Sequence, residues 1–404
     1  MIAVIGQGYV GLPLAIAVTK KFSKVIGFDN NIGKINDLNL GISGIEDLSN
    51  EQIKDALKSG RYKATTNPSE ISGAEIYLIC VPTPLSENRK PDLTYLINAT
   101  ETVAKVMKPG SLIIIESTIE PGTTRNVVVP ILEKFSNLQR ENFFVAFSPE
   151  RIDPVNRQWT IENTPKLVAG LNRLAAEKAL NFYSSFIKKV DLCESLEVAE
   201  TAKLLENSFR LINISFINEF SKFCHQIDID VNDVIRAAST KPYGFMPFYP
   251  SIGVGGHCIP VDPLYLAEAA REVGAPTRFI DLANEINQSM PSYFVQRATE
   301  IIGDLNGKRV LVLGVAYKPN VADTRETPVK VLIEGLRKLG ALVSWHDDLV
   351  QNWKSETSVE ISNNFDLAIL ATPHNDIDLT KLGGVPLLNT RETGSAHNSD
   401  KALK

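Results

Sequence analysis

Short apolar runs alternate with longer stretches of mixed character along the first half of the chain. Residues 2–6 (IAVIG) and 24–29 (KVIGFD) flank a segment, 9–22, whose apolar residues have helical spacing. Further apolar runs of strand length follow, with helix-like segments between several of them, at 74–82, 111–118 and 143–150. Because buried parallel strands alternate with helices in this way, the pattern predicts a doubly wound parallel sheet.

The pattern changes at about residue 195. Apolar residues in 195–227 recur three and four positions apart, and the segment contains no proline or glycine. This spacing predicts one long helix, followed by a helical segment at 230–239. We therefore expect a central helical domain. A helix of this kind often forms a dimer interface, and a helix buried within one subunit is the alternative.

Strand and helix patterns return near Asn306. Strand-like runs occupy 307–317, 341–348 and 365–374, and a helical pattern occupies 327–340. The predicted fold class is therefore α/β, with two Rossmann-like, doubly wound parallel-sheet domains joined by a central helical domain that contains one long helix. The expected domain boundaries are 1–190, 191–300 and 301–404.

Composition narrows the class of protein. Of 404 residues, 44% are hydrophobic and 22% charged, which is typical of a globular chain with more than one domain. The net charge of −5 gives no basic surplus for nucleic acid, and no apolar run approaches the length of a membrane span. The start, MIAVIGQGYVG, lacks the features of a signal peptide, so we expect a cytoplasmic protein. The cysteines are far apart, which argues against a disulfide framework or a metal site: Cys80, Cys193, Cys224 and Cys258.

A glycine motif follows the first apolar run. The motif, GQGYVG, consists of Gly6, Gln7, Gly8, Tyr9, Val10 and Gly11. Its glycines permit a tight turn and let backbone N–H groups approach a pyrophosphate at a helix N-terminus. The next strand ends at Asp29, whose carboxylate can accept hydrogen bonds from ribose hydroxyls and would repel a 2′-phosphate. This context predicts a dinucleotide site that prefers NAD to NADP, with a glycine turn and a surface acid as the alternative.

Two later loops at strand ends carry small hydroxyl residues and prolines. CVPTP contains Thr83, and ESTIEPGTT contains Thr118. Because such loops line the ligand crevice of an open parallel sheet, both threonines are candidate cofactor or active-site contacts. Hydroxyls that cap helix starts are the alternative.

The stretch GVGGHCIPVDP places Cys258 between a glycine run and a helical pattern. The glycines let the backbone pass close to a bulky ligand, and the prolines suit the first turn of a helix. We expect Cys258 at or near a helix N-terminus, where the dipole favours the thiolate. Asp262, one turn later, can share its face and hold a water or a cation. An inert buried thiol is the alternative, and it fits the other three cysteines better.

Polar residues in apolar surroundings supply further candidates. Lys203 and Asn207 are four residues apart in the predicted long helix, one turn after Glu200, so they share a face. Glu150 and Arg151 end a strand, where the carboxylate can act as a general base and the guanidinium can hold it or a phosphate. Solvated polar groups are the alternative.

A loop in the last third of the chain also concentrates charge. Lys318, Asp323 and Arg325 follow the apolar run at 307–317. Side chains of this kind suit a second anionic ligand group, and solvated loop charges are the alternative.

Seven motifs, taken together and in order, resemble the UDP-glucose/GDP-mannose dehydrogenase family of nucleotide-sugar 6-dehydrogenases. They are GQGYVG, CVPTPL, ESTIEPGTT, FSPERIDP, ETAKLLENSFR, GVGGHCIPVDPLYL and GVAYKPNVADTRETP. The likeness spans nearly the whole chain. It implies an NAD-binding domain, a central domain with the catalytic cysteine and the dimer contact, and a UDP-sugar-binding domain. It also implies oxidation of a sugar C6 alcohol by two NAD⁺ to a UDP-uronic acid, a precursor of surface polysaccharide.

The resemblance implies roles for individual residues. Cys258 is the expected nucleophile, which holds the aldehyde as a thiohemiacetal and then as a thioester. Lys203 and Asn207 are expected to stabilise the developing oxyanion, and Asp262 to assist proton transfer through water. Glu150 is the expected base for hydrolysis of the thioester.

Other residues are expected to bind rather than react. Thr118 is expected to orient substrate or water near the nicotinamide, and Arg325 to contact the cofactor pyrophosphate. The residues expected at the substrate are Glu150, Arg151, Lys203, Asn207, Tyr249, Ser251, Gly255 and Lys318. Many family members have GPG where this chain has SIG at 251–253, a difference in loop conformation that leaves the catalytic residue types intact.

The motifs also bear on the substrate. CVPTPLSENRKPDLTYL, FSPERIDPVN and TKPYGFMPFYPSIGVGGHC are closer to the branch that oxidises UDP-N-acetylhexosamines, notably UDP-N-acetylglucosamine, than to the UDP-glucose branch. UDP-glucose and UDP-N-acetylmannosamine are the alternatives. Two other classes compete: a hydroxy-acid dehydrogenase that stops at the carbonyl, and a non-catalytic sensor of NAD or nucleotide sugar. The NADH formed per sugar, two, one or none, separates the three.

Overall fold

The computed structural model describes residues 1–45, 48–152, 156 and 158–393 of the chain. The chain divides into two compact units. The first consists of Met1–Glu206 with Leu264–Ala275, and the second of Asn207–Pro263 with Pro276–Lys404. Each unit is described by itself below.

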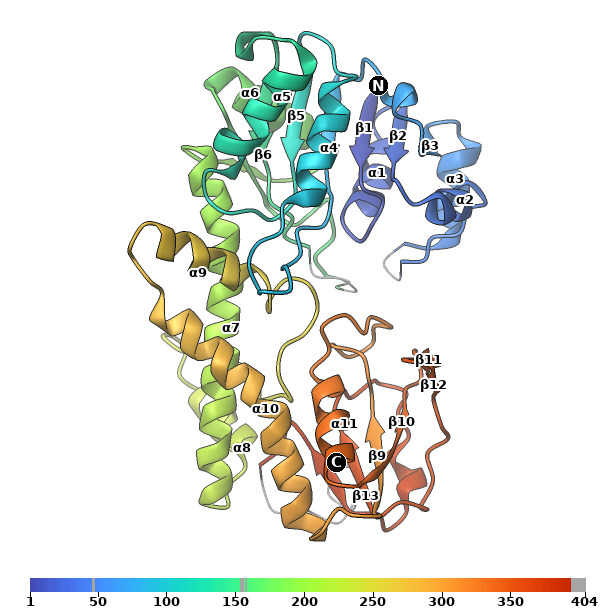
Figure 1. Cartoon of the computed structure of the whole chain (residues 1–404), viewed down its shortest axis with the longest axis vertical. Helices are drawn as coiled ribbons and strands as arrows, with labels where there is room; N and C mark the ends of the chain where they lie inside the picture. Colours follow the sequence, from blue (N-terminus) through green and yellow to red (C-terminus); the bar gives the residue numbers. More distant parts are fainter. Residues whose placement is uncertain (46–47, 153–155, 157, 394–404) are drawn as a thin grey trace. The chain divides into compact units, whose positions relative to one another are not determined.

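The first unit contains an eight-stranded sheet with the order β3-β2-β1-β4-β5-β6-β7-β8 (Figure 1). Neighbouring strands are parallel except for β6 and β7, which pair antiparallel through Phe147 and Ala169. The strands are β1 (Ile2–Ile5), β2 (Val25–Phe28), β3 (Tyr62–Thr65), β4 (Ile76–Ile79), β5 (Leu112–Ile115), β6 (Phe144–Phe147), β7 (Lys166–Gly170) and β8 (Val190–Leu192). This is the doubly wound arrangement that the apolar runs predict.

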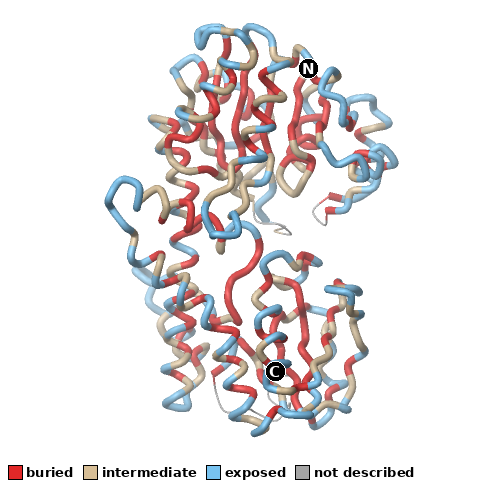
Figure 2. The backbone as a smooth tube through the Cα atoms, in the orientation of Figure 1, coloured by how far each residue is buried: buried red, intermediate tan, exposed pale blue. Residues whose placement is uncertain are grey.

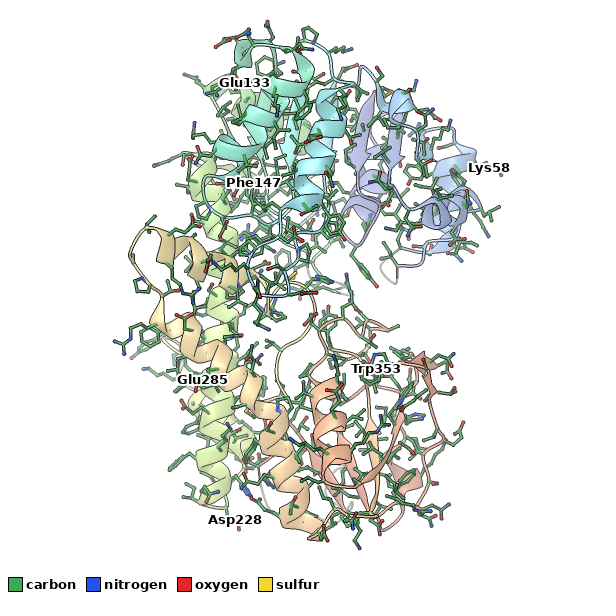
Figure 3. The ribbon with its side chains drawn as sticks, in the orientation of Figure 1. Lys58, Glu133, Phe147, Asp228, Glu285 and Trp353 are labelled. Carbon is green, nitrogen blue, oxygen red and sulfur yellow. The ribbon has the colours of Figure 1, made fainter. Side chains whose placement is uncertain are left out.

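Two apolar clusters lie on opposite faces of this sheet because alternate strand residues point to opposite sides. Val4 and Leu12 belong to one cluster, and Ile5 and Phe147 belong to the other. The helices are α1 (Gly11–Thr19), α2 (Ile32–Asn39), α3 (Asn50–Lys58), α4 (Thr94–Ala104), α5 (Val129–Ser136) and α6 (Arg173–Ser184). The strands form a buried centre (Figure 2), with Phe147 inside the unit and Lys58 at its periphery (Figure 3).

A single long helix, α7 (Leu196–Gln226), has residues in both units and extends for 31 residues. The prediction of a long helix in this segment is therefore confirmed. The helix ends before Asp228, which has a φ of +54°, and Asp230 caps the next helix, α8 (Val231–Ala238), by accepting the Asn232 N–H. α9 (Asp262–Glu272) also has residues in both units.

The second unit contains a four-stranded parallel sheet with the order β10-β9-β13-β14. Its strands are β9 (Arg309–Leu313), β10 (Leu342–His346), β13 (Leu367–Leu370) and β14 (Leu387–Asn389). α11 (Val329–Lys338) and part of α10 (Arg278–Ile302) pack on one face through residues such as Leu332 and Phe294. A short hairpin, β11 (Asn352–Trp353) and β12 (Glu356–Thr357), follows β10.

The predicted fold class is confirmed by these two parallel sheets and the long helix. Three strands of the first sheet, β3, β7 and β8, have no counterpart among the sequence predictions. Their sequences, YKAT, KLVAG and VDL, are short or contain a charged residue, so periodicity alone does not distinguish them from loop. Among the described residues, no helix is long and apolar enough to cross a membrane.

Candidate active site

The glycine motif occupies the turn between β1 and α1. A Cβ on Gly6 would lie 2.7 Å from the carbonyl oxygen of Cys80, and Gly6 has a φ of +89°, so only glycine fits there without strain. A Cβ on Gly11 would lie 1.9 Å from the carbonyl oxygen of Gly6. Gly8, by contrast, has open space beside it, with no atom within 4 Å of an added Cβ. The turn therefore leaves room for a pyrophosphate at Gly8, next to the start of α1.

Asp29 lies directly after β2 and turns its carboxylate toward this motif. It accepts hydrogen bonds from the backbone N–H groups of Gln7 at 2.9 Å and Asn31 at 3.0 Å, and it pairs with Lys34 at 3.0 Å. Burial alone would raise the pKa of Asp29, but these donors lower it overall, so the carboxylate is ionised at neutral pH. Its side chain retains 14% exposure. Tyr9 and Val10, the motif residues before α1, pack against the core.

The two predicted threonine loops contact each other. The Thr83 hydroxyl donates to the carbonyl of Thr118 at 2.7 Å. The Tyr265 hydroxyl, from α9, donates to the carbonyl of Thr83 at 3.0 Å. Neither Thr83 nor Thr118 caps a helix, so the alternative that these hydroxyls cap helix starts is wrong. Sequence reasoning missed Tyr265, which lies in an apolar helical pattern and shows no signal there.

The first turns of α7 are bound to the loop that follows Thr118. Both carboxylate oxygens of the fully buried Glu200 accept backbone N–H groups, from Gly122 at 2.6 Å and Thr124 at 3.1 Å. Lys203 lies one turn later on the same helix and is only 7% exposed. A lysine that is buried so deeply requires polar or charged partners. Its burial therefore fits a binding site better than a polar helix face exposed to solvent.

Glu150 and Arg151 lie in the segment after β6, and residues 153–155 of the same motif lie outside the described residues. Glu150 accepts the backbone N–H of Ile152 at 2.5 Å. Arg151 pairs with Glu206 of α7 at 2.7 Å. A cavity of about 10 Å³, room for about one water molecule, is lined in part by Glu150, Arg151 and Lys166.

The remaining predicted catalytic residues belong to the second unit. Cys258 is exposed and lies one turn before the first residue of α9, whose Asp262 N–H donates to the Cys258 carbonyl at 2.8 Å. The side chains of Asn207 and Asp262, 5% and 3% exposed, meet in a hydrogen bond of 2.6 Å from the Asn207 amide to the Asp262 carboxylate. The structure thus joins two residues that the sequence predicts separately, and one of them, Asp262, follows Cys258 by one helical turn.

The glycine run before Cys258 passes close to protein rather than leaving a gap. A Cβ on Gly255 would lie 2.7 Å from Tyr317 Cβ and 2.8 Å from the carbonyl oxygen of Glu326. The Gly256 N–H donates to the carbonyl of Arg325 at 3.0 Å. The run therefore binds the cysteine loop to the charged loop after β9, which is a packing reason for these glycines beside the ligand-contact reason.

The loop that contains the SIG departure, residues 251–253, is bound to side chains of α10 and α7. Gly253 has a φ of +133°, a conformation that only glycine adopts freely. Its neighbour Val254 donates to the Asn287 side chain at 2.7 Å, and Ser251 donates to that of Asn218 at 2.8 Å. The chain thus has glycine at position 253, where the backbone conformation requires it. Ser251 is bound to Asn218 by a hydrogen bond of its backbone N–H and not of its side chain.

The last predicted contacts lie on loops of the second unit. Arg325 binds Asp323 through two side-chain nitrogens and is 42% exposed. Lys318 is half-buried in the same loop, and Tyr249 is 56% exposed. The charged loop therefore presents an arginine that is already ordered by a carboxylate.

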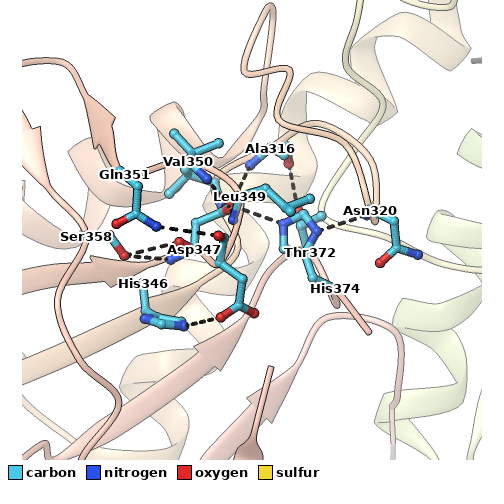
Figure 4. Close-up of polar contacts among 12 residues, drawn as sticks. Ala316, Asn320, His346, Asp347, Leu349, Val350, Gln351, Ser358, Thr372 and His374 are labelled. Carbon is cyan, nitrogen blue, oxygen red and sulfur yellow. Dashed lines mark hydrogen bonds and ion pairs between the residues drawn. The ribbon is translucent and has the colours of Figure 1, made fainter. Parts of the chain in front are cut away.

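The second sheet carries a carboxylate that corresponds in position to Asp29. Asp347, whose polar contacts are drawn in Figure 4, follows β10 and is fully buried. It accepts the backbone N–H groups of Val315 at 2.7 Å and Leu349 at 2.9 Å and bonds His374 at 3.1 Å. Burial alone would raise the pKa of Asp347, but these donors lower it. The neighbouring pocket of about 190 Å³ has more acidic than basic lining side chains, which suits a diphosphate poorly. The acidic residues are Asp347, Asp348, Glu360, Asp376 and Asp378.

Three domain models of one protein family match successive segments that together cover most of the chain. The UDP-glucose/GDP-mannose dehydrogenase family matches through its NAD binding domain at residues 1–187, its central domain at 197–289 and its UDP binding domain at 311–388.

Individual proteins match over most of their length. The chain is 38% identical to Protein CapL of Staphylococcus aureus over 93% of this chain and 90% of that protein. It is 37% identical to UDP-N-acetyl-D-glucosamine 6-dehydrogenase of Pseudomonas aeruginosa, over 86% of this chain and 83% of that protein. A solved structure of the UDP-D-ManNAc dehydrogenase of Pyrococcus horikoshii superposes with a TM-score of 0.91 at 32% identity and covers 99% of this chain and 97% of that chain.

Proposed function

Because the chain belongs to the UDP-glucose/GDP-mannose dehydrogenase family, we propose that it oxidises the C6 hydroxyl of a UDP-N-acetylhexosamine to a carboxylate. The single observation that carries the proposal is the cysteine loop, in which Cys258 lies one turn before a helix whose first residue binds Asn207. A two-electron dehydrogenase or a sensor has no use for a thiol and a buried polar pair of this kind. The balanced reaction consumes one alcohol, two NAD⁺ and one water, and yields one carboxylate, two NADH and three protons.

The first unit supplies the NAD-binding domain. When bound there, NAD⁺ would supply the hydride acceptor for both oxidations. Space beside Gly8 and the ionised carboxylate of Asp29 fit its pyrophosphate and ribose, respectively. Thr83, Thr118 and Arg325 complete the set that we assign to the cofactor.

Cys258 holds the sugar between the two oxidations. After the first hydride leaves C6, the thiolate adds to the aldehyde carbon, and the C–S bond of a thiohemiacetal forms as the oxygen gains a proton. Loss of the second hydride and that proton gives a thioester. Only sulfur adds readily and also leaves readily, so a serine at this position does not replace it.

Neighbouring side chains stabilise charge and move protons. We assign Lys203 and Asn207 to the oxygen on C6, where an ammonium and an amide N–H oppose its developing negative charge. Asp262, which accepts the Asn207 amide, is assigned to proton transfer through water and orients that amide.

Water completes the reaction by hydrolysing the thioester. Glu150 takes a proton from the attacking water, the new C–O bond forms, and the C–S bond breaks with its electron pair on the sulfur of Cys258. Thr118 is assigned to orienting substrate or water. Binding of the nucleotide sugar is assigned to Arg151, Tyr249, Ser251, Gly255 and Lys318.

The choice of an N-acetylated sugar rests on two supports. The motifs favour that branch, and the similar proteins include a UDP-N-acetyl-D-glucosamine 6-dehydrogenase and a UDP-D-ManNAc dehydrogenase. An acetamido group adds one amide and one methyl group to the substrate, so a site that binds both groups favours it over the plain hydroxyl. UDP-N-acetylglucosamine is our first choice.

We extend the proposal to organisation and location. The three matched domains support the division 1–190, 191–300 and 301–404. Exposed phenylalanines seven residues apart on α7, Phe209, Phe216 and Phe223, support a homodimer or higher homo-oligomer through this helix. We place the enzyme in the cytoplasm and its product in surface-polysaccharide synthesis.

The test is the stoichiometry of NADH in wild-type protein and in Cys258→Ser. Wild-type protein should form two NADH and one uronic acid per UDP-N-acetylglucosamine. The variant should lose acid formation by about 1,000-fold or more, because it lacks the group that carries the intermediate. Absorbance at the NADH band and chromatography of the sugar products measure both quantities.

Cys193→Ser is the matched control, since that thiol is half-buried and lies outside the proposed site. It should retain wild-type stoichiometry. Full four-electron turnover by Cys258→Ser would show that the thioester scheme is wrong. One NADH per sugar in the wild type would favour a simple alcohol dehydrogenase, and a panel of UDP- and GDP-sugars decides the substrate.

A further inference from the structure

The segment that carries Glu150 is bound side by side with the start of β7. The antiparallel pairing of β6 and β7 ends at Phe147 and Ala169. Beyond it, three side chains replace the missing ladder hydrogen bonds, each with one backbone carbonyl as acceptor. They are Ser148 to Leu167 at 2.7 Å, Lys166 to Pro149 at 3.2 Å, and Arg151 to Pro165 at 2.9 Å. Glu150 is therefore flanked on both sides by tethered residues.

Lys166 is the exceptional member of this set because its charge is buried. Its side chain is 9% exposed, and its ammonium bonds Glu116 at 2.5 Å. Glu116, at the end of β5, is completely buried and also accepts the hydroxyl of Tyr183 from α6. The lysine thus links three elements of the first unit to the backbone beside Glu150.

A buried ion pair is a poor stabiliser by itself, since desolvation offsets most of the attraction. Burial alone would lower the pKa of Lys166, but the carboxylates of Glu116 and Glu150 raise it, so the ammonium stays charged. Its charge therefore acts on two carboxylates. One, Glu116, is a fixed anchor, and the other belongs to the residue assigned to the chemistry.

We propose that Lys166 is a positioning residue for Glu150. Its ammonium is fixed by Glu116, and it holds the Pro149 carbonyl, so it sets the backbone from which the Glu150 carboxylate reaches the water that attacks the thioester. The inference rests on the proposed function, because it assigns Glu150 to hydrolysis. It predicts that loss of Lys166 slows the last step and leaves both oxidations nearly intact.

The test uses Lys166→Met, which keeps the length of the side chain and removes its charge and donors. Misplacement of a reacting group by about 1 Å costs up to about 100-fold, so steady-state turnover should fall about 10- to 100-fold. Rapid mixing with NAD⁺ and UDP-N-acetylglucosamine should then give a burst of two NADH per subunit before the slow phase. Mass spectrometry of the quenched protein should find the sugar acyl group on Cys258.

Hydroxylamine separates positioning from general damage. As a strong nucleophile it attacks the thioester without a base, so it should restore the slow phase of Lys166→Met and yield a hydroxamate. A merely structural role predicts weaker NAD binding, a smaller burst and no response to hydroxylamine, and that outcome would overturn the proposal. So would unchanged turnover in a folded variant.

Two further variants keep the test sharp. Glu116→Gln weakens the anchor while keeping its volume, and it should give the same burst with a smaller loss; absence of a burst there as well as in Lys166→Met contradicts the proposal. Lys189→Met removes an exposed lysine near the start of β8 and should behave as wild type. If wild-type protein forms no NADH from any nucleotide sugar, the proposed function is wrong. If wild-type turnover is normal but no thioester accumulates in the variants, only the role of Lys166 is wrong.

Discussion

Glu120 has a carboxylate in a position that disfavours its charge. It lies two residues after Thr118, and its Oε1 atom is buried and accepts no hydrogen bond among the described residues. Burial, followed by the negative charges of Glu272 and Glu268 on α9, raises its pKa to about 7. The loop that we assign to the cofactor and substrate therefore changes charge near neutral pH.

The pH dependence of stability has a definite sign. Glu120 binds its proton more tightly in the folded than in the unfolded protein, so stability is lost as pH rises from about 4.5 to about 7 and stays lower above that. Glu120→Gln removes this loss. At pH 8 we expect the free energy of unfolding of the variant to exceed that of the wild type by about 1 kcal/mol and its Tm to be higher by about 2–4 °C. This value allows for the partial exposure of the Glu120 side chain.

Thermal unfolding of wild type and variant at pH 5 and pH 8, without ligands, measures the effect. The gain should shrink to near zero at pH 5, where the wild-type carboxyl is already protonated. The exposed Glu87→Gln is the control and should show no pH-dependent difference. An equal gain for Glu120→Gln at both pH values would contradict the assignment.

Single residues differ in how far sequence alone could reveal them. The placement of the glycine motif, Asp29 and Cys258 at strand and helix ends was predictable because their spacing relative to strand and helix patterns is itself the signal. The bond between Asn207 and Asp262 was not, since 55 residues separate them and only packing joins them. Lys166 and Glu120 are likewise ordinary charges in the sequence, and their burial arises from neighbours on other elements.

At the scale of elements, the start of α7 is fixed by two interactions of unequal worth. Glu197 pairs with Arg125 at 2.7 Å, but both side chains are more than a third exposed. Glu200 is completely buried and satisfies two backbone N–H groups of the turn after Thr118. Removing a buried acceptor leaves these donors unpaired, whereas an exposed ion pair contributes little. We therefore expect Glu200 to contribute more to the stability of the protein than the pair of Glu197 and Arg125.

Glu200→Ala should therefore lower the free energy of unfolding by about 2–3 kcal/mol, and Arg125→Gln by less than about 1 kcal/mol. Urea unfolding followed by circular dichroism gives both values. Because Thr118 and Lys203 flank this contact in sequence, turnover should also fall in Glu200→Ala. Equal losses of stability in the two variants would mean that the buried carboxylate does not anchor the helix.

Helices and strands also differ in how well the sequence predicts them. The long helix was predictable because 31 residues give many repeats of one spacing. β3 and β8 were not, because four or three residues carry almost no periodic signal and their place in the sheet depends on pairing with a neighbour. β7 begins with the charged Lys166, whose partner Glu116 lies 50 residues earlier. Its role becomes visible only in three dimensions.

At the scale of the whole molecule, α7 presents an apolar stripe to solvent. Phe209, Phe216 and Phe223 are 46%, 62% and 54% exposed and recur every seven residues. Such a stripe on a helix of 31 residues matches the seam by which two helices pack. This is the structural support for the proposed dimer.

Phe216→Glu should convert the proposed dimer to monomer by placing a charge in that seam. A loss of about 3 kcal/mol raises the dissociation constant about 100-fold. Sedimentation velocity over a range of protein concentrations measures the change. Val331→Glu, at a 46% exposed position on α11, is the matched control and should leave the assembly unchanged. A variant of Phe216 that remains a tight dimer would place the interface elsewhere.

The contrast between Asp29 and Asp347 limits how many cofactors one chain can hold. Asp29 keeps part of its carboxylate open, whereas Asp347 is fully covered and engaged by its own loop and His374. Among the described residues, only one of the two Rossmann-like sheets thus offers a ribose acceptor. If both proposed oxidations use that one site, the cofactor would have to be exchanged between them. The proposed bond to Cys258 would then keep the partly oxidised sugar from leaving as a free aldehyde during the exchange.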